Sequence, residues 1–289
     1  MITKYKMQIE KITQETEDSK SIILVPAESD DGLFDYMPGQ FFTVEAEIMR
    51  PKVMVYDRSK KMMVGSGELV NVTERKAFSA VSSPTEEGYI ELLVKSEKGV
   101  FAPYFLKQYG VGDFCTLQGP QGRFMANIFQ NGEKFVACWS AGSGIPSTIS
   151  LMKYAIDKEL DLKVTVFDSN KTVEDIIYHE RIKEFINQSE NFISVFTVTR
   201  GDRFPNSNHP RVTYSSGRLW TDGENTLAKH AGGNWRSFFN TICGSSSFIN
   251  GIGRDDNSKL AKLGDGIEDH LLEFGIPKNK IDKDQYYLQ

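Results

Sequence analysis

Residues 135–146 read FVACWSAGSGIP, an unbroken apolar run followed by a turn that contains two glycines. Such a run predicts a strand buried on both faces, which is typical of a parallel sheet covered by helices. Glycines at a strand-to-helix junction let the backbone approach a ligand closely, and the start of the following helix offers free N–H groups to a phosphate. The turn follows the first strand of a parallel sheet, where ligands of such folds bind. This position favours a nucleotide site over a turn that needs glycine only for its dihedral angles.

The chain beyond Gly132 alternates between apolar runs and amphipathic segments. Strands are predicted at residues 135–139, 163–168, 192–199, 240–243 and 285–288. Helices are predicted at residues 147–159, 173–187 and about 259–274. This alternation predicts an α/β domain with a doubly wound parallel sheet over residues 132–289.

The chain before Gly132 has a different texture, with short β-type runs separated by turn residues. Strands are predicted at residues 21–26, 40–46, 77–82, 89–96 and 114–118. Many short strands and little helical periodicity predict a closed antiparallel β-barrel over residues 1–131, because closure leaves no sheet edge unpaired. Three stretches fit neither half well. Residues 49–69 predict a hairpin or a loop excursion, and residues 201–236 and 251–264 predict irregular, polar connections.

The composition is that of an ordinary globular protein, with 289 residues of which 39% are hydrophobic and 25% are charged. A formal net charge of -5 argues against nonspecific nucleic-acid binding, which needs a basic surface. Since no apolar run is long enough for a membrane span and the N-terminus lacks a secretion signal, we expect a soluble cytoplasmic protein. The scattered Cys115, Cys138 and Cys243 predict neither a disulfide nor a metal site, so redox chemistry would need an organic cofactor.

Several short motifs follow one another along the chain. They are Pro38-Gly39-Gln40-Phe41, Lys76-Ala77-Phe78-Ser79 followed by Ser82-Ser83-Pro84, Gly112-Asp113, Gly119 to Phe124, Gly142 to Pro146, and Cys243-Gly244 with Phe248. In their order and spacing the chain resembles the ferredoxin-NADP reductase superfamily of flavin and NAD(P)-binding oxidoreductases, in the form without a fused iron-sulfur domain. The resemblance implies an N-terminal antiparallel flavin-binding β-barrel followed by a doubly wound parallel-sheet NAD(P)-binding domain.

The resemblance implies a flavin site on the second of these motifs. In the family an Arg pairs with the flavin phosphate, a Tyr stacks on the isoalloxazine, and a Ser or Thr forms a hydrogen bond near N5. Lys76, Phe78 and Ser79 occupy these places here, with Ala77 between them, so the charge and the stacking face are kept while the guanidinium fork and the phenol hydroxyl are lost. Arg75 competes for the phosphate only if the strand register slips. Without the motif, Ser79 would read as an ordinary strand serine facing solvent.

A second flavin contact region is implied downstream of the first. Its positions are Val94, Lys95, Gly99, Val100, Phe101 and Ala102. Ala102 stands where the family often has a Ser or Thr that touches the pyrophosphate, so backbone N–H groups are expected to bind this group instead. FAD is expected rather than FMN, by analogy with family members that lack a fused iron-sulfur domain.

The nicotinamide nucleotide is implied to bind at the ends of the parallel strands. Its candidate residues are Gly142, Ser143, Gly144, Ile145, Ser169, Asn170, Thr199, Arg200, Cys243, Gly244 and Phe248. Thr199-Arg200 resembles the Ser-Arg pair of NADP-preferring members, so we expect NADPH to be preferred over NADH, with Lys171 assisting Arg200 at the 2′-phosphate. Arg200 is otherwise a solvated strand-end residue, and Asp168 would reverse the preference if it pointed at the ribose.

Two residues are implied to take part in hydride transfer. Ser79 would act near the flavin N5, and Cys243 would lie beside the nicotinamide without serving as a reactive thiolate. Cys115 and Cys138 are expected to be small buried residues. Tyr286 and Tyr287 are expected to belong to the last strand, with a lid over the flavin as the alternative.

The implied function is to move electrons between NAD(P)H and a separate one-electron carrier protein, such as ferredoxin, a Rieske-type protein or a flavodoxin. A basic group could dock an acidic carrier or could be a solvated loop; it consists of Arg50, Lys52, Arg58, Lys60 and Lys61. Two alternatives stay open. One is a flavin-bearing electron-transfer or regulatory subunit without independent NAD(P)H activity, and the other is a flavin-free binding module.

Overall fold

The computed structural model describes residues 3–28, 35–57, 59–60, 62–96, 99–201, 204–205, 209–219, 235–254 and 259–286. The chain divides into two compact units, one within Met1–Arg123 and the other within Phe124–Tyr287. The predicted domain boundary after residue 131 stays a prediction, because compactness alone does not define a domain. No described helix combines the length and the apolar content that crossing a lipid bilayer would take.

The first unit is a curled antiparallel sheet of six strands. They are β1 (Thr3–Thr16), β2 (Ser19–Pro26), β3 (Phe41–Asp57), β4 (Met62–Ser79), β5 (Ile90–Lys95) and β6 (Phe114–Gln121). Their order in the sheet is β4-β3-β6-β1-β2-β5. The two end strands approach each other where β4 ends, through an isolated bridge between Ala80 and Leu92. The predicted antiparallel barrel is thus a curled half-barrel whose end strands meet at this one bridge among the described residues.

Alternation along the strands places the core inside the curl. On β3 the side chains of Phe42, Val44, Ala46 and Ile48 are buried, while the residues between them face outward. This is the period of two that a strand with one buried face requires. Each large apolar side chain removed from water stabilises the unit by about 2 kcal/mol. Helix α1 (Phe101–Gln108) closes part of the curl and contributes Phe101 and Phe105 to the same core.

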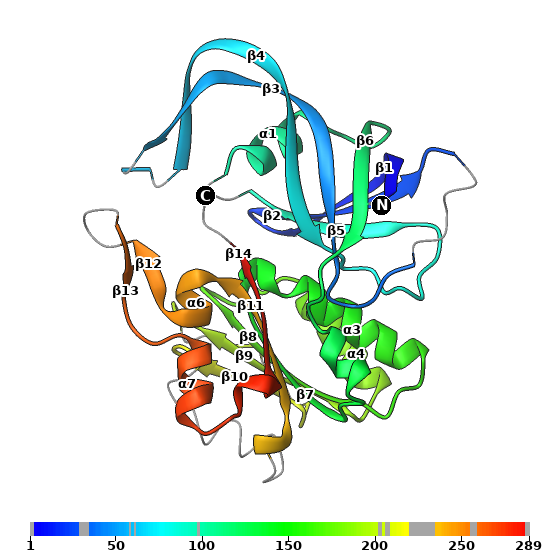
Figure 1. Ribbon diagram of the computed structural model, residues 1–289, viewed down its shortest axis with the longest axis vertical. Coiled ribbons are helices and arrows are strands. Elements are labelled where there is room, and N and C mark those ends of the chain that lie inside the picture. Colours follow the sequence, from blue (N-terminus) through cyan, green and yellow to red (C-terminus); the bar gives the residue numbers. More distant parts are fainter. Residues whose placement is uncertain are drawn as a thin grey trace. The chain divides into compact units, whose positions relative to one another are not determined.

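Residues 49–69 form a hairpin, which confirms the first of the two forms predicted for this stretch. β3 and β4 continue there as a two-stranded arm beyond their neighbours in the sheet (Figure 1). Its base is held by α1, because the side-chain amide of Gln108 donates to the Met49 carbonyl at 2.8 Å and accepts from the Met49 N–H at 2.9 Å. The Tyr109 hydroxyl also donates to the Glu47 carbonyl at 2.9 Å. These side-chain hydrogen bonds replace the backbone hydrogen bonds to β6, which does not pair with this part of β3.

The second unit is a parallel sheet in the order β10-β9-β8-β7-β11-β14. Its strands are β7 (Phe135–Ala141), β8 (Lys163–Asn170), β9 (Phe192–Val198), β10 (Val212–Ser216), β11 (Phe239–Ser245) and β14 (Ile281–Tyr286). Helices α3 (Pro146–Asp157) and α4 (His179–Gln188) lie on one side of the sheet, and α6 (Ser246–Asn250) and α7 (Ile267–Glu273) lie on the other (Figure 1). This arrangement confirms the predicted doubly wound α/β half.

Aromatic packing joins the central strands of this sheet. Trp139 on β7 and Phe167 on β8 occupy paired positions, and their rings stack at 4.1 Å between centroids. The Trp139 indole N–H, although buried, donates to the Asn240 side chain on β11 at 3.0 Å. A buried Trp therefore keeps a partner for its polar atom while filling the core.

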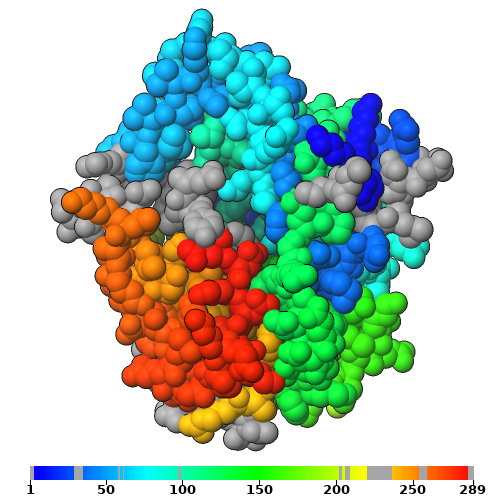
Figure 2. Space-filling model, viewed as in Figure 1, coloured from blue at the N-terminus to red at the C-terminus, as the bar shows by residue number. Residues whose placement is uncertain are grey.

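The short helix α2 (Ala126–Gln130) begins the second unit and lies next to its last strand. The Met125 N–H donates to the Asp282 carboxylate at 2.9 Å. Burial raises the pKa of Asp282, against the two backbone N–H groups that lower it. In Figure 2 the C-terminal strand (red) accordingly reaches the surface beside the green residues around α2. The start and the end of this unit are thus joined.

Several predicted elements were wrong in their bounds. Helix α4 begins at His179 and not at residue 173, because Thr172 bonds to Asp175 in a turn and Tyr178 takes a left-handed φ of 58°. The helix expected at about 259–274 is replaced by the short strand β13 (Leu260–Lys262) and α7. Helix α7 starts only after Gly266, where the chain crosses the end of α6 so closely that a Cβ would overlap the α6 backbone. β13 pairs with β12 (Ile252–Arg254), so the stretch 251–264 contains a hairpin.

Candidate functional site

The glycine turn after β7 is a short 3-10 turn, Gly142–Gly144, that leads into α3. Gly142 has a left-handed φ of 54°, which favours glycine. Gly144 has no room for a side chain, because a Cβ there would overlap the carbonyl oxygen of Cys243 and lie 2.7 Å from its carbonyl carbon. The structure therefore explains why glycine occupies both positions. The second glycine brings the start of α3 against the end of β11.

The start of α3 has no side-chain cap, and residues Gly144 to Thr148 are buried there. Its N-cap position is Ile145, whose side chain has no acceptor for the first N–H groups, and its first turn carries no acidic residue. Unsatisfied N–H groups and the positive end of the helix dipole favour a phosphate at such a place. The predicted turn residues Gly142, Ser143, Gly144 and Ile145 are thus brought together, with the Ser143 side chain half-buried.

The predicted Cys243 element lies directly behind this turn. Cys243 is buried, and its Sγ lies 3.9 Å from the Asp284 carboxylate on the adjacent strand β14. A Cβ on Gly244 would lie 2.8 Å from the Phe248 ring, so this glycine lets the ring pack against the strand end. The contact with Asp284 could not be foreseen, because the sequence does not give the register of β11 against β14.

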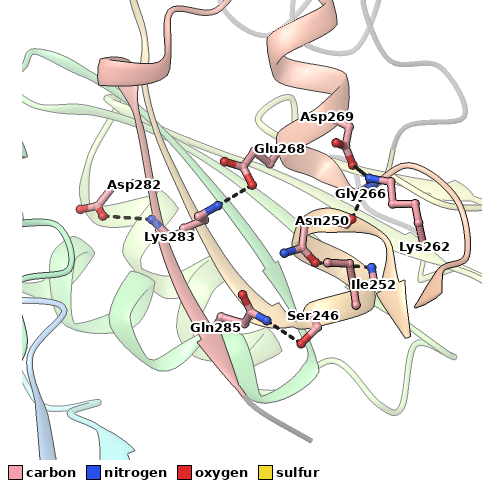
Figure 3. Close-up of polar contacts among 10 residues, drawn as sticks. All are labelled: Ser246, Asn250, Ile252, Lys262, Gly266, Glu268, Asp269, Asp282, Lys283 and Gln285. Atoms are coloured by element: carbon pink, nitrogen blue, oxygen red, sulfur yellow. Dashed lines mark hydrogen bonds and ion pairs between the residues drawn. The ribbon is translucent and has the colours of Figure 1, made fainter. Parts of the chain in front are cut away.

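Polar contacts hold α6 and its neighbours at the end of β11 (Figure 3). The Gln285 amide on β14 donates to the Ser246 hydroxyl at 2.6 Å, and Lys283 pairs with Glu268 on α7 at 2.5 Å. Asp269 accepts from the Gly266 N–H at 2.8 Å and pairs with Lys262. The element that follows Cys243 is therefore fixed by two neighbouring segments.

Asp168 at the end of β8 is turned into the protein. It is 1% exposed and accepts from the Ser140 hydroxyl at 2.7 Å and from the Asn170 amide at 2.5 Å. A buried carboxylate with these donors is not placed to bond a ribose at the surface. The side-chain amide of Asn170, a predicted cofactor residue, is committed to Asp168, and the residue is buried.

The two cations predicted at the 2′-phosphate are brought together. The ends of β8 and β9 continue side by side, because the Thr199 N–H donates to the Asn170 carbonyl at 3.0 Å and the Arg200 N–H to the Lys171 carbonyl at 2.7 Å. Lys171, Thr199 and Arg200 are exposed, and Ser169 is half-buried. Within the described part of the chain, neither Lys171 nor Arg200 has an ion-pair partner. Their charges remain available to an anion.

In the first unit, the flavin element lies at the end of β4 in the predicted register. Lys76 and Phe78 lie on one face of the strand, and Ala77 and Ser79 on the other. Arg75 pairs with Glu45 through Nε at 2.5 Å, which removes it as the competing phosphate partner. Lys76 and Ala77 are exposed, so the Lys76 ammonium is accessible.

Phe78 and Ser79 are less exposed to solvent than Lys76 and Ala77 before them. Ser79 is 6% exposed, and the buried side-chain oxygens without a partner in the described structure belong to Ser147, Ser194 and Thr197. Ser79 is therefore not an ordinary serine facing solvent. The Phe78 ring is half-buried and lies 5.8 Å from the Phe101 ring at the start of α1. The two predicted flavin contact regions thus meet through this aromatic pair.

The second contact region is the start of α1, a helix that was not predicted. Gly99 and Val100 are half-buried, and Val100 at the N-cap has no side-chain acceptor. Phe101 and Ala102 are buried in the core, so their backbone N–H groups are what they offer to a ligand. This agrees with the expectation that backbone groups bind the pyrophosphate where Ala102 lacks a hydroxyl.

Lys95, predicted in the same region, is used by the unit itself. Its ammonium lies 3.5 Å from the Asp18 carboxylate, and its side chain is only 11% exposed. Burial raises the pKa of Asp18, but Lys95 and the hydroxyls of Ser19 and Thr16 outweigh this effect and hold the pKa below its usual value. Val94 beside it is buried in the core.

The remaining predicted residues are placed as follows. Cys115 and Cys138 are buried, as expected, and burial raises their pKa to about 12 and about 11. Tyr286 is the last residue of β14, opposite Ser245. Tyr287, Arg58 and Lys61 lie outside the described residues.

Comparison with known proteins gives one family match and several similar proteins. The family described as oxidoreductase FAD-binding domain matches residues 62–125, which include the flavin element and the start of α1. NADH-cytochrome b5 reductase 1 of Dictyostelium discoideum is 27% identical over 136 residues, which are 46% of this chain and 45% of that protein. The glycine betaine monooxygenase reductase subunit of Chromohalobacter salexigens is 23% identical over 200 residues, 69% of this chain and 48% of that protein. The chain thus spans about half the length of the curated relatives it matches.

Solved structures share the whole fold. The flavohem-like FAD/NAD binding domain of nitric oxide dioxygenase from Vibrio cholerae has a TM-score of 0.68 at 18% identity and covers 98% of both chains. A ferredoxin NADP+ reductase from Neisseria gonorrhoeae with bound FAD and NADP has a TM-score of 0.67 at 16% identity, covering 98% of this chain and 99% of that one. The chain thus shares the fold of these FAD- and NAD(P)-binding proteins, and its residues 62–125 match the oxidoreductase FAD-binding domain family.

Proposed function

We propose that this chain is a flavin-dependent oxidoreductase that moves electrons between NAD(P)H and a separate electron-carrier protein. The observation that carries the proposal is the match of residues 62–125 to the FAD-binding domain family, because this segment contains Lys76, Phe78 and Ser79 at the end of β4. A flavin held against the end of β4 would offer the Ser79 hydroxyl a hydrogen-bond partner.

The residues present fit FAD as the bound group. Lys76 provides an accessible cation for the phosphate, Phe78 an aromatic face, and the open start of α1 provides N–H groups for the pyrophosphate. When bound, the flavin accepts a hydride at N5 and releases electrons singly, which no side chain of this protein can do. Ser79 would donate a hydrogen bond to it, and Phe101 would fix the Phe78 ring.

The second unit fits a nicotinamide nucleotide. The first turn of α3 and the glycine turn would bind the pyrophosphate, and Cys243 would form the wall beside the nicotinamide. Its buried thiol fills space and excludes water there.

We propose NADPH as the preferred nucleotide. Arg200 and Lys171 are exposed, adjacent and without an acidic partner in the described chain, while the nearby Asp168 is buried and bonded. Two accessible cations favour the 2′-phosphate that distinguishes NADPH. The names of several relatives, such as NADH-cytochrome b5 reductase, favour NADH instead. Substitution of Arg200 decides between the two.

The acceptor is proposed to be a separate protein. Relatives are named as cytochrome b5 reductases or as reductase subunits and components of monooxygenases. An acidic carrier such as ferredoxin is one candidate, together with a Rieske-type protein or a flavodoxin. The described cations of the arm do not favour it as the docking site, because Arg50 pairs with Glu74 and Lys52 with Glu68. A cytoplasmic location stays a prediction from the sequence.

A second candidate is a reductase subunit that carries flavin but has no NAD(P)H activity of its own. The resemblance to a protein named as a monooxygenase reductase subunit favours it. Titration of the purified chain with FAD, followed by anaerobic addition of NADPH and NADH, separates the candidates. The proposal expects stoichiometric uptake of FAD and bleaching of its visible absorption by NADPH. Uptake without bleaching by either nucleotide supports the subunit, and no uptake supports a flavin-free binding module.

Replacing Ser79 with Ala is expected to slow flavin reduction about tenfold, since one well-placed hydrogen bond that acts in the transition state is worth about 1 to 2 kcal/mol. Stopped-flow absorbance with saturating NADPH measures this rate. The melting temperature should not fall, because the substitution removes only the hydroxyl and keeps the β-carbon. An unchanged rate constant would remove Ser79 from the proposed mechanism.

A further inference from the structure

The chain just after Ser79 is held by a buried tyrosine. Tyr36 lies before β3 and is 4% exposed. Its hydroxyl donates to the Ser82 carbonyl at 2.8 Å and lies 3.0 Å from the Ser82 hydroxyl oxygen. The ring is fixed edge-on against Phe42, with 5.5 Å between centroids. The tyrosine therefore joins two segments that are 46 residues apart in the sequence.

The protons of this cluster can be assigned. The single Tyr36 proton goes to the Ser82 carbonyl, and the Tyr36 oxygen can at the same time accept a proton from the Ser82 hydroxyl. The Ser82 hydroxyl oxygen in turn accepts from the Glu91 N–H on β5 at 3.0 Å. Burial raises the pKa of Tyr36, which keeps it a donor. Each of these polar atoms thus has a partner, as a network at this depth requires.

The cluster completes the hydrogen bonds that join β4 to β5. After Ser79, the Ala80 N–H donates to the Gln40 carbonyl at 3.1 Å and the Val81 N–H to the Glu91 carbonyl at 2.9 Å. Regular pairing then stops, and the Ser82 side chain takes over as the acceptor for the Glu91 N–H. Tyr36 bonds the backbone and the side chain of Ser82 together. Three successive residues after Ser79 are therefore fixed to two other segments, the connection before β3 and strand β5.

We propose that Tyr36 is a positioning residue for Ser79, setting the place of the Ser79 hydroxyl through Ser82. This inference rests on the proposed flavin function. The Tyr36 hydroxyl is hydrogen-bonded to Ser82 and is therefore not expected to bind a ligand itself. It acts by fixing the end of the strand that carries Ser79. A reacting group that is displaced by a fraction of an ångström loses much of its rate advantage.

The test compares Tyr36→Phe, which removes only the hydroxyl, with a matched control. Tyr89→Phe is the control, since it removes a hydroxyl bonded to Glu86 in the same connection and leaves the Tyr36–Ser82 hydrogen bonds in place. The full FAD-loaded chain is mixed with NADPH in a stopped-flow instrument. Tyr36→Phe is expected to slow flavin reduction by about fivefold to tenfold with an unchanged KM, and Tyr89→Phe by less than about twofold. In a Ser79→Ala background, Tyr36→Phe should add less than about twofold.

A purely structural role predicts other results. If Tyr36→Phe lowers only the melting temperature, or slows reduction equally with and without Ser79, the positioning role is wrong. Should Tyr36→Phe fail to fold, Ser82→Ala breaks the same contact and is expected to slow reduction to a similar extent. If the unsubstituted flavoprotein is not reduced by either nucleotide, the proposed function fails separately. Photoreduction then still tests the inference, since Tyr36→Phe should shift the flavin midpoint potential in the same direction as Ser79→Ala, and no shift overturns it.

Discussion

Replacing Gly144 with Ala is expected to destabilise the second unit by roughly 3 kcal/mol, near the upper end of the usual cost of overpacking. The reason is that the added methyl group would meet backbone atoms, namely the carbonyl of Cys243 and the N–H of Gly244, and not the movable end of a side chain. Either the end of β11 or the start of α3 must shift. Thermal unfolding followed by circular dichroism should show a fall of about 6 to 12 °C in the melting temperature of that unit.

The same substitution should also impair nucleotide use, because the displaced segments are those proposed to bind the pyrophosphate and to line the nicotinamide. Gly110→Ala is the control, since the nearest atom to its new Cβ would be an Asp113 oxygen at 3.8 Å, an ordinary contact. It should change stability by less than about 0.5 kcal/mol. If Gly144→Ala melts like the unsubstituted protein, the close approach of the turn to β11 is wrong.

The parallel sheet could be predicted from the sequence because its strands are buried on both faces. β7, β8 and β9 read as continuous apolar runs, and their observed bounds differ from the predicted ones by three residues or fewer. β1 was not predicted, since it is half polar and starts among charged residues, and only Met7 and Ile9 mark its buried face. A strand whose stability comes from its neighbours carries a weak signal of its own.

Helix α1 was missed for a related reason. It has only eight residues and contains Pro103, which is tolerated because it lies in the first turn where no N–H partner is needed. Its first residues were predicted only as part of a flavin contact region, without a secondary structure. The start of a helix presents backbone N–H groups, so the expected chemistry is compatible with the observed secondary structure.

Within the candidate site, the sequence located residues but not the direction of their side chains. Gly144 was expected in the turn after a strand and follows β7, whereas Ser79 was expected inside a strand over residues 77–82 and is the last residue of β4. The sequence could not tell that Asp168 turns inward, because that depends on Ser140 one strand away and on the pairing of β7 with β8. The role of Tyr36 was equally hidden, since its partner Ser82 is 46 residues distant. Contacts between strands are set by register, which a single sequence does not contain.

Replacing Arg200 with Ala is expected to raise the KM for NADPH about thirtyfold while changing the KM for NADH by less than about twofold. A guanidinium bonded to a phosphate contributes about 2 kcal/mol beyond what water supplies, and only NADPH carries the 2′-phosphate. Lys171→Ala should act in the same direction but more weakly, because an ammonium lacks the bidentate fork. Steady-state kinetics with both nucleotides measures each effect.

Two further measurements separate a phosphate contact from a general effect of charge. Lys158→Ala removes one positive charge at the C-terminal end of α3. Because α3 has twelve residues, this charge is about 18 Å from the start of the helix, and its removal should leave both KM values unchanged. Because a phosphate monoester loses one negative charge below about pH 6, the preference for NADPH should weaken as the pH falls through that value in the unsubstituted protein and stay absent in Arg200→Ala. Equal effects of Arg200→Ala on both nucleotides would end the NADPH assignment. The likeness in fold and the match to the FAD-binding domain family would be untouched, because neither depends on Arg200.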